Sequence, residues 1–444
     1  MMLQRYWRWI AVTAAGVLGL LTTSVPADLS DFAGLGDGLL GGGFGRVYEG
    51  AWNQAGPLQL VISRLLLVGG REGMPSPMVM ALVDAGLMLG ALAVARRSRR
   101  TPGWCELATA VLTLLWLAGP VPWNGHPAEV AIPACWASAV ALQRRHRPLA
   151  AATVLAAAVA IAPWAVLGFP CLLAAASVRQ SARTALLAAA FAVLAYAPFA
   201  ATGTFGMFGQ VWDVAPRSLL HAVAPDLQHV TWPARLVQGV VVAGGCALLA
   251  HRYRGQQLMI GAAPLAAALL RVATDPLTYT YYWTPVAVGT VLLLALMPDG
   301  ERRHRQLLAV AAGYLALLAA SAGSSAGALA SLGLLAAVLL RSRPRRGKQP
   351  GPGSPRAGLE PGANRRPSAG GVPGTAGLIH LAARHQRNTN GLLRQYFPKG
   401  TSLAPHDRQT LRTVEDRLNQ RPRKMVEAVG GDAGQAARTT RSGD

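Results

Sequence analysis

The sequence predicts an all-α polytopic membrane protein, and three observations lead to that prediction. Hydrophobic residues make up 52% of the 444 residues and charged residues 14%, and the mean hydropathy is +0.31. This composition is too apolar for a soluble protein of this length. Apolar runs of roughly membrane-spanning length recur between residues 1 and 340. Arginine clusters and aromatic or acidic loops alternate between the runs, as expected when basic loops stay on the cytoplasmic side.

The charge divides the chain into regions of different character. Residues 1–340 carry 22 Arg, no Lys and 13 Asp or Glu, a net charge of +9, whereas residues 341–444 carry a net charge of +13. We expect a polytopic membrane domain at 1–340, a disordered basic Pro- and Gly-rich linker at 341–377, a small appendage at 378–428 and a disordered tail at 429–444. The use of Arg alone before residue 341, with abundant Ala and Gly, is typical of a GC-rich bacterial genome.

The four cysteines, Cys105, Cys135, Cys171 and Cys246, all lie within apolar runs. None is paired with another ligand at the spacing of a metal site. They are predicted to be small core residues, so neither a disulfide nor a zinc site is expected.

The first apolar run, Trp9–Val25, follows Arg5 and Arg8. A cleaved signal peptide is one interpretation, but an uncleaved helix is preferred because a polytopic protein follows. Positive charge before the helix places the N-terminus in the cytoplasm and the loop Asp28–Pro57 outside.

The next two apolar segments, Pro57–Gly70 and Pro77–Ala95, decide the predicted topology. If both crossed the membrane, the basic clusters at 96–100 and 144–147 would lie outside, against the positive-inside tendency. We therefore expect Pro57–Gly70 to form a short re-entrant or interfacial helix. The expected total is about 10–13 transmembrane or re-entrant helices.

The remaining segments are predicted to alternate between the two sides of the membrane. Two outward loops are expected, a long one at Ala201–Trp232 and a compact aromatic one at Thr274–Trp283. The expected helices are Trp104–Trp123, Pro127–Gln143, a pair broken by Pro163 and Pro170 within Pro148–Val178, Thr184–Ala200, Pro233–Ala250, Gly255–Ala273, Thr284–Pro298 and two short helices within Gln306–Leu340.

A string near the C-terminus carries a specific resemblance. NTNGLLRQYFPKGT at Asn388–Thr401 is followed by LNQRPRK at Leu418–Lys424, and this segment resembles the C-terminal part of the integrase core of insertion-sequence transposases with an Asp-Asp-Glu triad. In that family a catalytic Glu directly precedes the string, but here Arg387 occupies that position. Because two-metal chemistry needs the carboxylates, the resemblance implies an inactive fragment joined to a membrane protein, and nucleic-acid binding is not expected.

A second resemblance rests on motifs of the membrane domain. Asp31 and Phe32 follow the first helix, LLGGGFGRVYE comes next, and QAGPLQL at Gln54–Leu60 opens the following apolar segment. The turn containing His126 and the aromatic loop near Thr274–Trp283 add to this pattern. Residues 1–340 resemble the GT-C superfamily of integral-membrane glycosyltransferases, particularly bacterial mannosyltransferases that use polyprenyl-phosphate sugars.

This resemblance implies inverting transfer of a sugar, which is mannose in the mannosyltransferases of that family, from a polyprenyl-phosphate donor to a lipid or glycan acceptor. The reaction would occur on the outer face of a multi-pass protein in the bacterial plasma membrane, with the N-terminus and the C-terminal tail cytoplasmic. One carboxylate takes the hydroxyl proton, and no cofactor or metal ion is required. Asp31 is the preferred base and Asp28 its alternative, although for Asp28 helix capping is the favoured interpretation. Asp37 is expected in a turn.

Further candidates for substrate binding are polar and aromatic residues expected on the same outer face. An arginine within an apolar segment, such as Arg64, is costly unless it is paired or faces water; snorkelling is the alternative. Ordinary hydrogen bonding in loops, or an aromatic belt at the bilayer surface, would explain most of the others. The candidates are Tyr48, Gln54, Arg64, His126, Glu129, Arg235, Asp275, Tyr279 and Tyr282.

Two other functions stay open at this point. A non-catalytic membrane protein or transporter would use the intramembrane arginines to line a pathway, although no inverted repeat is visible in the sequence. A transposition-related DNA-binding protein is favoured only by the C-terminal string and is opposed by the missing carboxylates.

Overall fold

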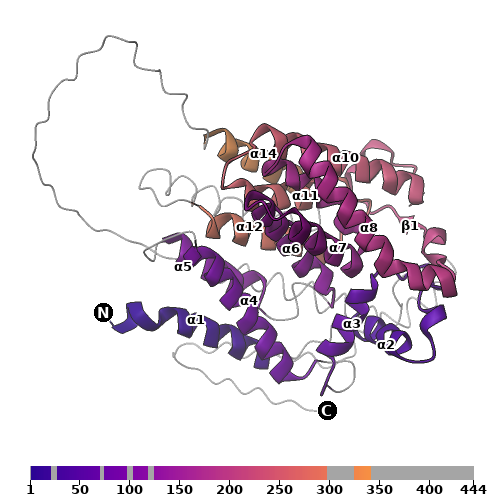
Figure 1. Cartoon of the computed structure of the whole chain (residues 1–444), viewed down its shortest axis with the longest axis horizontal. Helices are drawn as coiled ribbons and strands as arrows, with labels where there is room; N and C mark the ends of the chain where they lie inside the picture. The colour runs from indigo at the N-terminus through magenta and orange to yellow at the C-terminus, as the bar shows by residue number, and fades with distance from the viewer. Residues whose placement is uncertain are drawn as a thin grey trace, which may run out of the picture. The chain divides into compact units, whose positions relative to one another are not determined.

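We describe the protein from a computed structural model, which covers residues 2–21, 28–70, 75–97, 104–118, 125–297 and 325–341. These residues are mostly helical (Figure 1), as the sequence predicts. The expected linker, appendage and tail after residue 341 lie outside the described residues. So does the first of the two short helices expected within Gln306–Leu340.

The elements follow one another as a series of helices with short irregular connections. The α-helices are α1 (Met2–Leu20), α2 (Leu29–Leu40), α3 (Pro57–Leu66), α4 (Pro77–Arg97), α5 (Trp104–Trp116), α6 (Pro127–Arg144), α7 (Pro148–Ile161), α8 (Val178–Thr202), α9 (Leu219–Val223), α10 (Trp232–Arg252), α11 (Met259–Thr274), α12 (Thr284–Ala295) and α14 (Ser325–Arg341). The 3₁₀ segments are η1 (Phe44–Arg46), η2 (Pro163–Ala174), η3 (Gly206–Gly209) and η4 (Thr280–Trp283). Two short strands, β1 (Trp212–Asp213) and β2 (His229–Val230), pair antiparallel.

Helix α1 packs along α4, and the two lie side by side in Figure 1. Gly19 allows this contact, because a Cβ at that position would lie 2.5 Å from the carbonyl oxygen of Met80. At the other end of α1, Arg8 Nε donates to Glu106 Oε1 of α5 at 2.5 Å. A close backbone contact and a charge-assisted hydrogen bond therefore fix α1 against its neighbours.

The segment Asp28–Pro57 is expected to be an outer loop, with Asp28 at the cap of a short helix, and it contains the helix α2 from Leu29 to Leu40. Helix α2 packs on α3. The contact requires glycine at position 36, because a Cβ there would lie 2.6 Å from the carbonyl oxygen of Leu60. Asp37 lies within α2 and forms an ion pair with Arg64 of α3. The expectation that Asp37 sits in a turn is therefore wrong, since α2 continues past it to Leu40.

Helix α3 has ten residues, which corresponds to about 15 Å of helix. This is about half the thickness of the hydrocarbon core of a bilayer. The short helix expected in this segment is therefore present. Its re-entrant or interfacial position stays a prediction.

From α6 onward, consecutive helical segments run back and forth between two ends. Glu129, near the start of α6, contacts Arg271, near the end of α11. At the opposite end, Arg144 Nη1 of α6 donates to the carbonyl oxygen of Gln256, just before α11, at 3.0 Å. These two contacts show that α6 and α11 are antiparallel, and the predicted alternation of the helices across a membrane stays a prediction.

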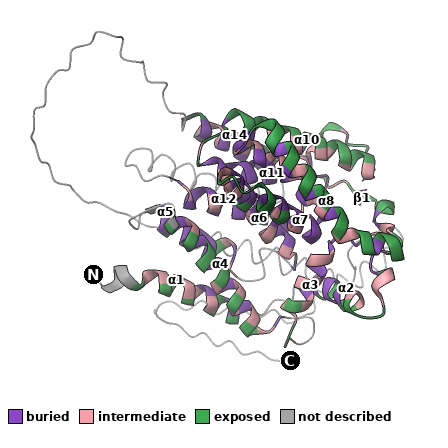
Figure 2. Ribbon diagram, viewed as in Figure 1, coloured by how far each residue is buried: buried purple, intermediate pink, exposed green. Residues whose placement is uncertain are grey.

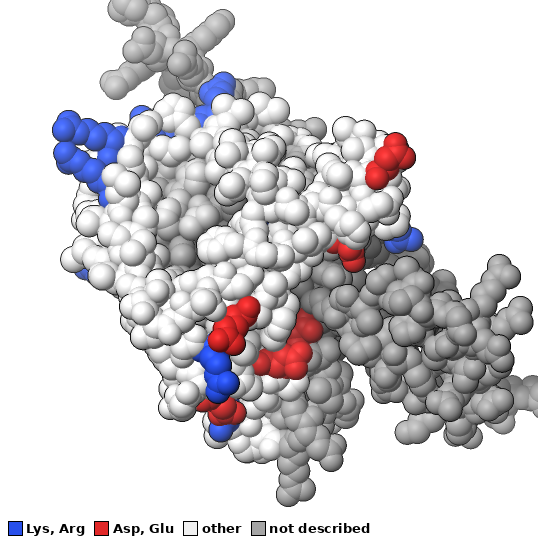
Figure 3. All heavy atoms as spheres, turned by 90° about the vertical axis from the view of Figure 1, so that its right-hand side faces the viewer, with Lys and Arg blue, Asp and Glu red and all other residues white. Residues whose placement is uncertain are grey.

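We name the two ends by the charged residues gathered there. The carboxylate end contains Asp28, Glu129 and Asp275, and the arginine end contains the three turns 144–147, 179–183 and 251–254. On the face of the molecule drawn in Figure 3, most of the surface is uncharged, and the acidic side chains lie apart from the group of basic side chains at its upper left.

The apolar stretch after α6 is broken near Pro163, as predicted. Helix α7 ends at Ile161, Ala162 is extended, and η2 continues from Pro163. Trp136 of α6 holds this break in place, because its Nε1 donates to the carbonyl oxygen of Ala165 at 2.8 Å and its ring lies directly against Gly168. Any side chain at Gly168 would overlap that ring.

Among the residues that the structure describes, three helices are long and apolar enough to cross a membrane, namely Pro77–Arg96, Val178–Thr202 and Trp232–Arg252. Away from the charged ends of these helices, their exposed residues are mostly apolar, and Figure 2 shows long exposed stretches on α8 and α10. Leu186 and Leu194 of α8 are 71% and 67% exposed, and Val240 of α10 is 72% exposed. Broad exposed apolar faces are expected against lipid. The finer expectation of about 10–13 transmembrane or re-entrant helices stays a prediction.

The cysteines are core residues, as predicted. Cys105, Cys171 and Cys246 are buried, and Cys135 is half-buried. Cys171 of η2 and Cys246 of α10 are free thiols whose sulfur atoms lie 3.5 Å apart. Their contact packs η2 against α10.

Candidate functional site

Asp28 and His126 meet at the carboxylate end, although they are 98 residues apart in sequence. His126 Nε2 lies 2.6 Å from Asp28 Oδ2, and both side chains are 13% exposed. An ionised carboxylate only accepts hydrogen bonds, so Nε2 carries the hydrogen when Asp28 is charged. Asp28 occupies the N-cap position of α2 but makes no capping hydrogen bond through its side chain. The capping interpretation favoured for Asp28 is therefore wrong, because the carboxylate turns toward α6 instead.

Local sequence explains why both residues sit at helix starts. Pro127 is the first residue of α6 and leaves His126 just outside the helix, which suits proline because it lacks a backbone N–H. The imidazole therefore projects from the connection before α6 rather than from the helix surface. Asp28 stands one residue before α2 in the same way.

Aromatic rings enclose the His126 imidazole. Tyr281 of η4 stacks on it with ring centroids 4.2 Å apart and an interplanar angle of 9°, and Phe32 of α2 meets it edge-on at 5.2 Å. Tyr279 also stacks on Tyr281, with ring centroids 5.5 Å apart and an interplanar angle of 9°. His126, Tyr281 and Tyr279 thus form a column of nearly parallel rings in consecutive contact, and the stacking on Tyr281 fixes the plane of the imidazole.

A buried ion pair lies beside this column. Arg271 of α11 donates to both carboxylate oxygens of Glu129, at 2.7 and 3.1 Å, and the two side chains are 7% and 3% exposed. The Arg271 guanidinium also lies over the rings of Trp164 at 3.8 Å and Tyr282 at 4.6 Å. Two parallel hydrogen bonds and two aromatic faces therefore hold this guanidinium in a single orientation.

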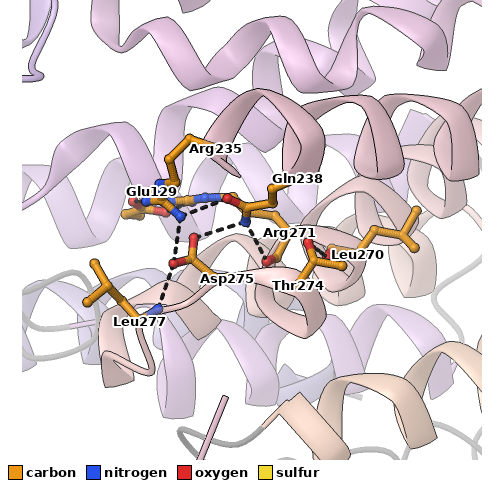
Figure 4. A network of polar contacts seen from close by, with 8 residues as sticks. All are labelled: Glu129, Arg235, Gln238, Leu270, Arg271, Thr274, Asp275 and Leu277. Carbon is orange, nitrogen blue, oxygen red and sulfur yellow. Dashed lines mark hydrogen bonds and ion pairs between the residues drawn. The ribbon is translucent and has the colours of Figure 1, made fainter. Parts of the chain in front are cut away.

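Asp275 is the centre of a second network, drawn in Figure 4. Its Oδ1 accepts from Arg235 Nη1 at 2.9 Å and from the backbone N–H of Leu277 at 3.0 Å. Its Oδ2 accepts from Gln238 Nε2 at 3.3 Å, and Gln238 Oε1 accepts from Arg235 Nη1 at 2.7 Å. The network ties the start of α10 to the loop after α11. It thereby anchors the loop that carries Tyr279 and Tyr281.

Tyr281 and Tyr282 join the two networks into one site. Their rings meet edge-on at 4.8 Å. Tyr281 faces His126, while Tyr282 faces Arg271. Contacts therefore run without a gap from Asp28 through His126 to Arg271 and Asp275.

The sequence-predicted candidates fall into two groups. The site contains Asp28, His126, Glu129, Arg235, Asp275, Tyr279 and Tyr282. Asp31 lies three residues beyond Asp28, in the first turn of α2, with its side chain exposed. Arg64 pairs with Asp37 near the other end of α2, about 13 Å along the helix from Asp28. Arg64 is paired, which is one of the two conditions expected of it, and its side chain is 39% exposed.

Tyr48 and Gln54 lie on the connection between α2 and α3. Tyr48 is packed in an apolar cluster, stacked on Phe205 at 5.1 Å and edge-on to Phe199 at 5.2 Å. Burial raises the pKa of the Tyr48 hydroxyl above its ordinary value, so this group stays protonated. Its hydroxyl has no hydrogen-bond partner among the residues that the structure describes. Gln54 is half-buried next to Asn53.

Several residues of the site were not singled out from the sequence as binding residues. Gln238 is the amide that links Arg235 to Asp275. The sequence feature that could have identified it is a polar residue one turn after Arg235 in an otherwise apolar helix. Trp164 gave no signal, since one tryptophan in an apolar run is ordinary. Asn53 is fully buried and fixes the loop by donating to the carbonyl oxygen of Val47 at 2.9 Å and accepting from the N–H of Ala55 at 3.2 Å.

The arrangement limits the chemistry available at the carboxylate end. An imidazole and a carboxylate in direct contact can accept, hold and return a proton. Glu129 and Asp275 each face an arginine and contribute little net charge. Within the described ranges, no group of three or more His, Cys, Asp and Glu is placed to hold a metal ion.

Comparison with curated proteins finds similarity to transposases over a short segment. The chain is 60% identical over 39 residues to the transposase for insertion sequence element IS1086 of Cupriavidus metallidurans, which is 9% of this chain and 12% of that relative. It is 56% identical over 39 residues to transposase InsI for insertion sequence element IS30A of Escherichia coli, 10% of that relative. It is 49% identical over 39 residues to the transposase for insertion sequence element IS4351 of Bacteroides fragilis, 12% of that relative.

The chain therefore spans only about a tenth of the length of these relatives. The predicted resemblance of a short segment to insertion-sequence transposases is confirmed at this level. No protein-family model and no solved structure matches the chain.

Proposed function

We propose that the chain is an integral-membrane glycosyltransferase of GT-C type, which moves a sugar, mannose by resemblance, from a polyprenyl-phosphate donor to a hydroxyl of a lipid or glycan acceptor. The observation that carries this proposal is the contact of Asp28 with His126 at 2.6 Å, beside helices whose exposed faces are apolar. A proton acceptor next to lipid-facing helices suits a reaction whose donor is an amphiphile. The segments expected to complete 10–13 transmembrane or re-entrant helices belong to this proposal.

In the proposed reaction, the acceptor oxygen forms a bond to the anomeric carbon of the sugar while the bond from that carbon to the phosphate oxygen breaks. The electron pair of the broken bond leaves with the polyprenyl phosphate. Asp28 takes the hydroxyl proton of the acceptor, and the configuration at the anomeric carbon inverts. Asp31 is the alternative base.

His126 has a positioning role in this mechanism. Its Nε2–H donates to the Asp28 carboxylate, and the stacking on Tyr281 keeps the imidazole in the plane that this hydrogen bond requires. Rigid support of a catalytic group contributes to rate because the group does not have to be reoriented at each turnover.

Arg235 is the proposed contact for the donor phosphate. Its Nη1 is held by Asp275 and Gln238, and its guanidinium lies 4.8 Å over the ring of Trp212. The side chain keeps 16% exposure, and a guanidinium has five N–H donors. The donors that Asp275 and Gln238 do not use would stabilise the charge that develops on the leaving phosphate.

The test is sugar transfer in membranes supplied with labelled polyprenyl-phosphate mannose. We expect Asp28→Asn to lower the rate by about 10²–10⁴-fold, the usual contribution of a general base. Asp31→Asn is measured in parallel. If Asp28→Asn retains activity and Asp31→Asn loses it, Asp31 is the base.

The chain offers a matched control. Asp213 and His229 form a second Asp–His contact at 2.9 Å, but their side chains are 80% and 62% exposed. Asp213→Asn should therefore leave the rate unchanged. If Asp28→Asn and Asp31→Asn were both fully active, with the proteins present at normal level, neither carboxylate at the start of α2 would be the base.

A further inference from the structure

The arginine end gathers eight basic side chains from three turns that are distant in sequence. All eight are exposed. They are Arg145, His146 and Arg147 after α6, Arg179 and Arg183 at the start of α8, and His251, Arg252 and Arg254 at the end of α10. We propose that this surface is a binding site for the phosphate headgroups of anionic phospholipids.

The fold brings the three turns together through hydrogen bonds between them. Thr184 Oγ1 donates to Gln143 Oε1 at 3.2 Å, which ties the start of α8 to the end of α6. Arg144 Nη1 donates to the carbonyl oxygen of Gln256 at 3.0 Å, which ties the end of α6 to the turn after α10. The basic residues of all three turns therefore surround the end of α6.

The end of α6 has a specific cap that presents its basic side chains outward. His146 has a φ of 57°, in the left-handed region. The N–H of Arg147 donates to the carbonyl oxygen of Leu142 at 3.0 Å, and the N–H of His146 donates to that of Gln143 at 3.1 Å. These two bonds define a Schellman motif, which glycine usually completes. Here a histidine completes it, and three consecutive basic residues leave the helix at one point.

The arginines of this surface differ from four other arginines of the described chain that form ion pairs. Arg8, Arg64, Arg235 and Arg271 each pair with a carboxylate. The exposed arginines of the arginine end make no ion pair with any residue in the described ranges, and residues 141–148, 175–184 and 250–258 contain no Asp or Glu. A surface with one sign of charge and unpaired guanidinium groups attracts phosphate.

Apolar side chains next to the arginines favour a lipid over a soluble anion. On α8, Leu186 lies one turn after Arg183 and is 71% exposed, and on α10, Leu248 lies one turn before Arg252 and is 70% exposed. A phospholipid matches both features, since its phosphate would contact the arginines and its acyl chain would cover the leucines. A nucleic acid or an acidic peptide would leave these leucines in water.

The test uses the full chain purified in detergent and native mass spectrometry to count bound lipids. The chain is titrated with phosphatidylglycerol and, separately, with zwitterionic phosphatidylcholine. We expect Arg179→Gln/Arg183→Gln to weaken phosphatidylglycerol binding more than ten-fold, since each basic residue near an anionic lipid surface contributes about five-fold. Phosphatidylcholine binding should not change.

Arg46→Gln/Arg217→Gln is the matched control, because both of these arginines are exposed and lie outside the three turns. It should bind phosphatidylglycerol like the unmodified chain. A second variant, Arg145→Gln/Arg147→Gln, should lose affinity as the first one does. The C-terminal tail is unchanged in all of these proteins, so differences between them report on the arginine end.

The proposal would be overturned if the control lost as much affinity for phosphatidylglycerol as the two variants do, or if both variants bound it as well as the unmodified chain. Displacement of phosphatidylglycerol by millimolar inorganic phosphate would also overturn it, because that result would indicate a site for a free anion. Binding of a mixed-sequence oligonucleotide that depends on Arg179 and Arg183, with no effect of the variants on lipid, would assign the surface to nucleic acid. The proposal does not depend on the glycosyl-transfer hypothesis, because the site and the measurement are separate from Asp28 and His126.

Discussion

The two ends of the helices from α6 to α12 handle charge in opposite ways. At the carboxylate end, opposite charges are buried in pairs and covered by aromatic rings, as in the Glu129–Arg271 contact at 2.7 Å. At the arginine end, charges of one sign are exposed, and the first residue after the cap of α6 adopts a left-handed conformation. A buried pair fixes the geometry of the chain around it, whereas an exposed cation is available to a partner outside the chain.

This difference decides which mutations should affect folding and which should affect binding. A buried charge that loses its partner remains in a medium of low dielectric, so the loss is large. An exposed arginine is solvated with or without a partner, so its removal changes stability little. Mutations at the carboxylate end should therefore mainly change the free energy of unfolding, and mutations at the arginine end should mainly change ligand binding.

The largest expected effect comes from breaking the Glu129–Arg271 pair. Arg271→Met leaves the Glu129 carboxylate buried without its two hydrogen bonds, and we expect the free energy of unfolding to fall by about 3–5 kcal/mol. The double variant Arg271→Met/Glu129→Leu removes both charges and should recover most of that loss. Unfolding by denaturing detergent in mixed micelles measures both.

Arg147→Met at the arginine end is the control for this prediction and should change the free energy of unfolding by less than about 0.5 kcal/mol. If the single and double variants at the carboxylate end were equally unstable, packing rather than charge pairing would explain the role of Arg271. If Arg147→Met were as destabilising as Arg271→Met, the contrast between the two ends would fail.

The break between α7 and η2 lies on the side of the carboxylate end, since Trp164 contacts Arg271, and its contact with Trp136 gives the next effect. Gly168→Ala would place a methyl group into the Trp136 ring, which already donates to the carbonyl oxygen of Ala165. We expect a loss of about 1–3 kcal/mol in the free energy of unfolding, as for other overpacked cores. The same micelle unfolding assay applies.

Gly244→Ala in α10 is the matched substitution, because nothing among the described residues lies within 4 Å of the added methyl group. Alanine is the better helix former, so this variant should be neutral or more stable than the parent. A similar loss in both glycine variants would mean that the cost is not due to Trp136.

Much of the helical arrangement could be predicted from the sequence. Apolar length and the placement of Pro163 located helices α6, α7, α8, α10, α11 and α12 and the break after Ile161, whereas the short helix α9 lies in a segment expected to be a loop. The extent of helix α2 was missed, because its glycines lower helix propensity. The missing information was tertiary, since Gly36 is needed where the carbonyl oxygen of Leu60 approaches α2.

The candidate site was predicted less well than the helices. His126 and the aromatic loop were expected on one face, and they do meet. The choice between Asp28 and Asp31 depends on the exact residue at which α2 begins, and composition does not determine such a boundary. The pairing of Glu129 with Arg271 joins residues 142 positions apart. A single sequence contains no signal for a contact of that separation.

The smallest expected effect concerns the C-terminal cap of α6 at the arginine end. It tests whether the backbone of this cap limits stability there. A left-handed conformation costs a residue with a Cβ about 1–2 kcal/mol, and His146 adopts one with φ of 57°. Glycine would remove that cost but would lose more entropy on folding. We therefore expect His146→Gly to raise the free energy of unfolding by about 0.5–1 kcal/mol in the micelle assay.

His146→Ala separates the backbone effect from the side-chain effect, because it removes the imidazole and keeps the unfavourable φ. This variant should show no gain in stability. Both variants retain Arg145 and Arg147, so phosphatidylglycerol binding should decrease far less than in Arg145→Gln/Arg147→Gln. A gain in His146→Ala equal to that in His146→Gly would mean that repulsion between the imidazole and its arginine neighbours, rather than the backbone of the cap, limits stability at this end.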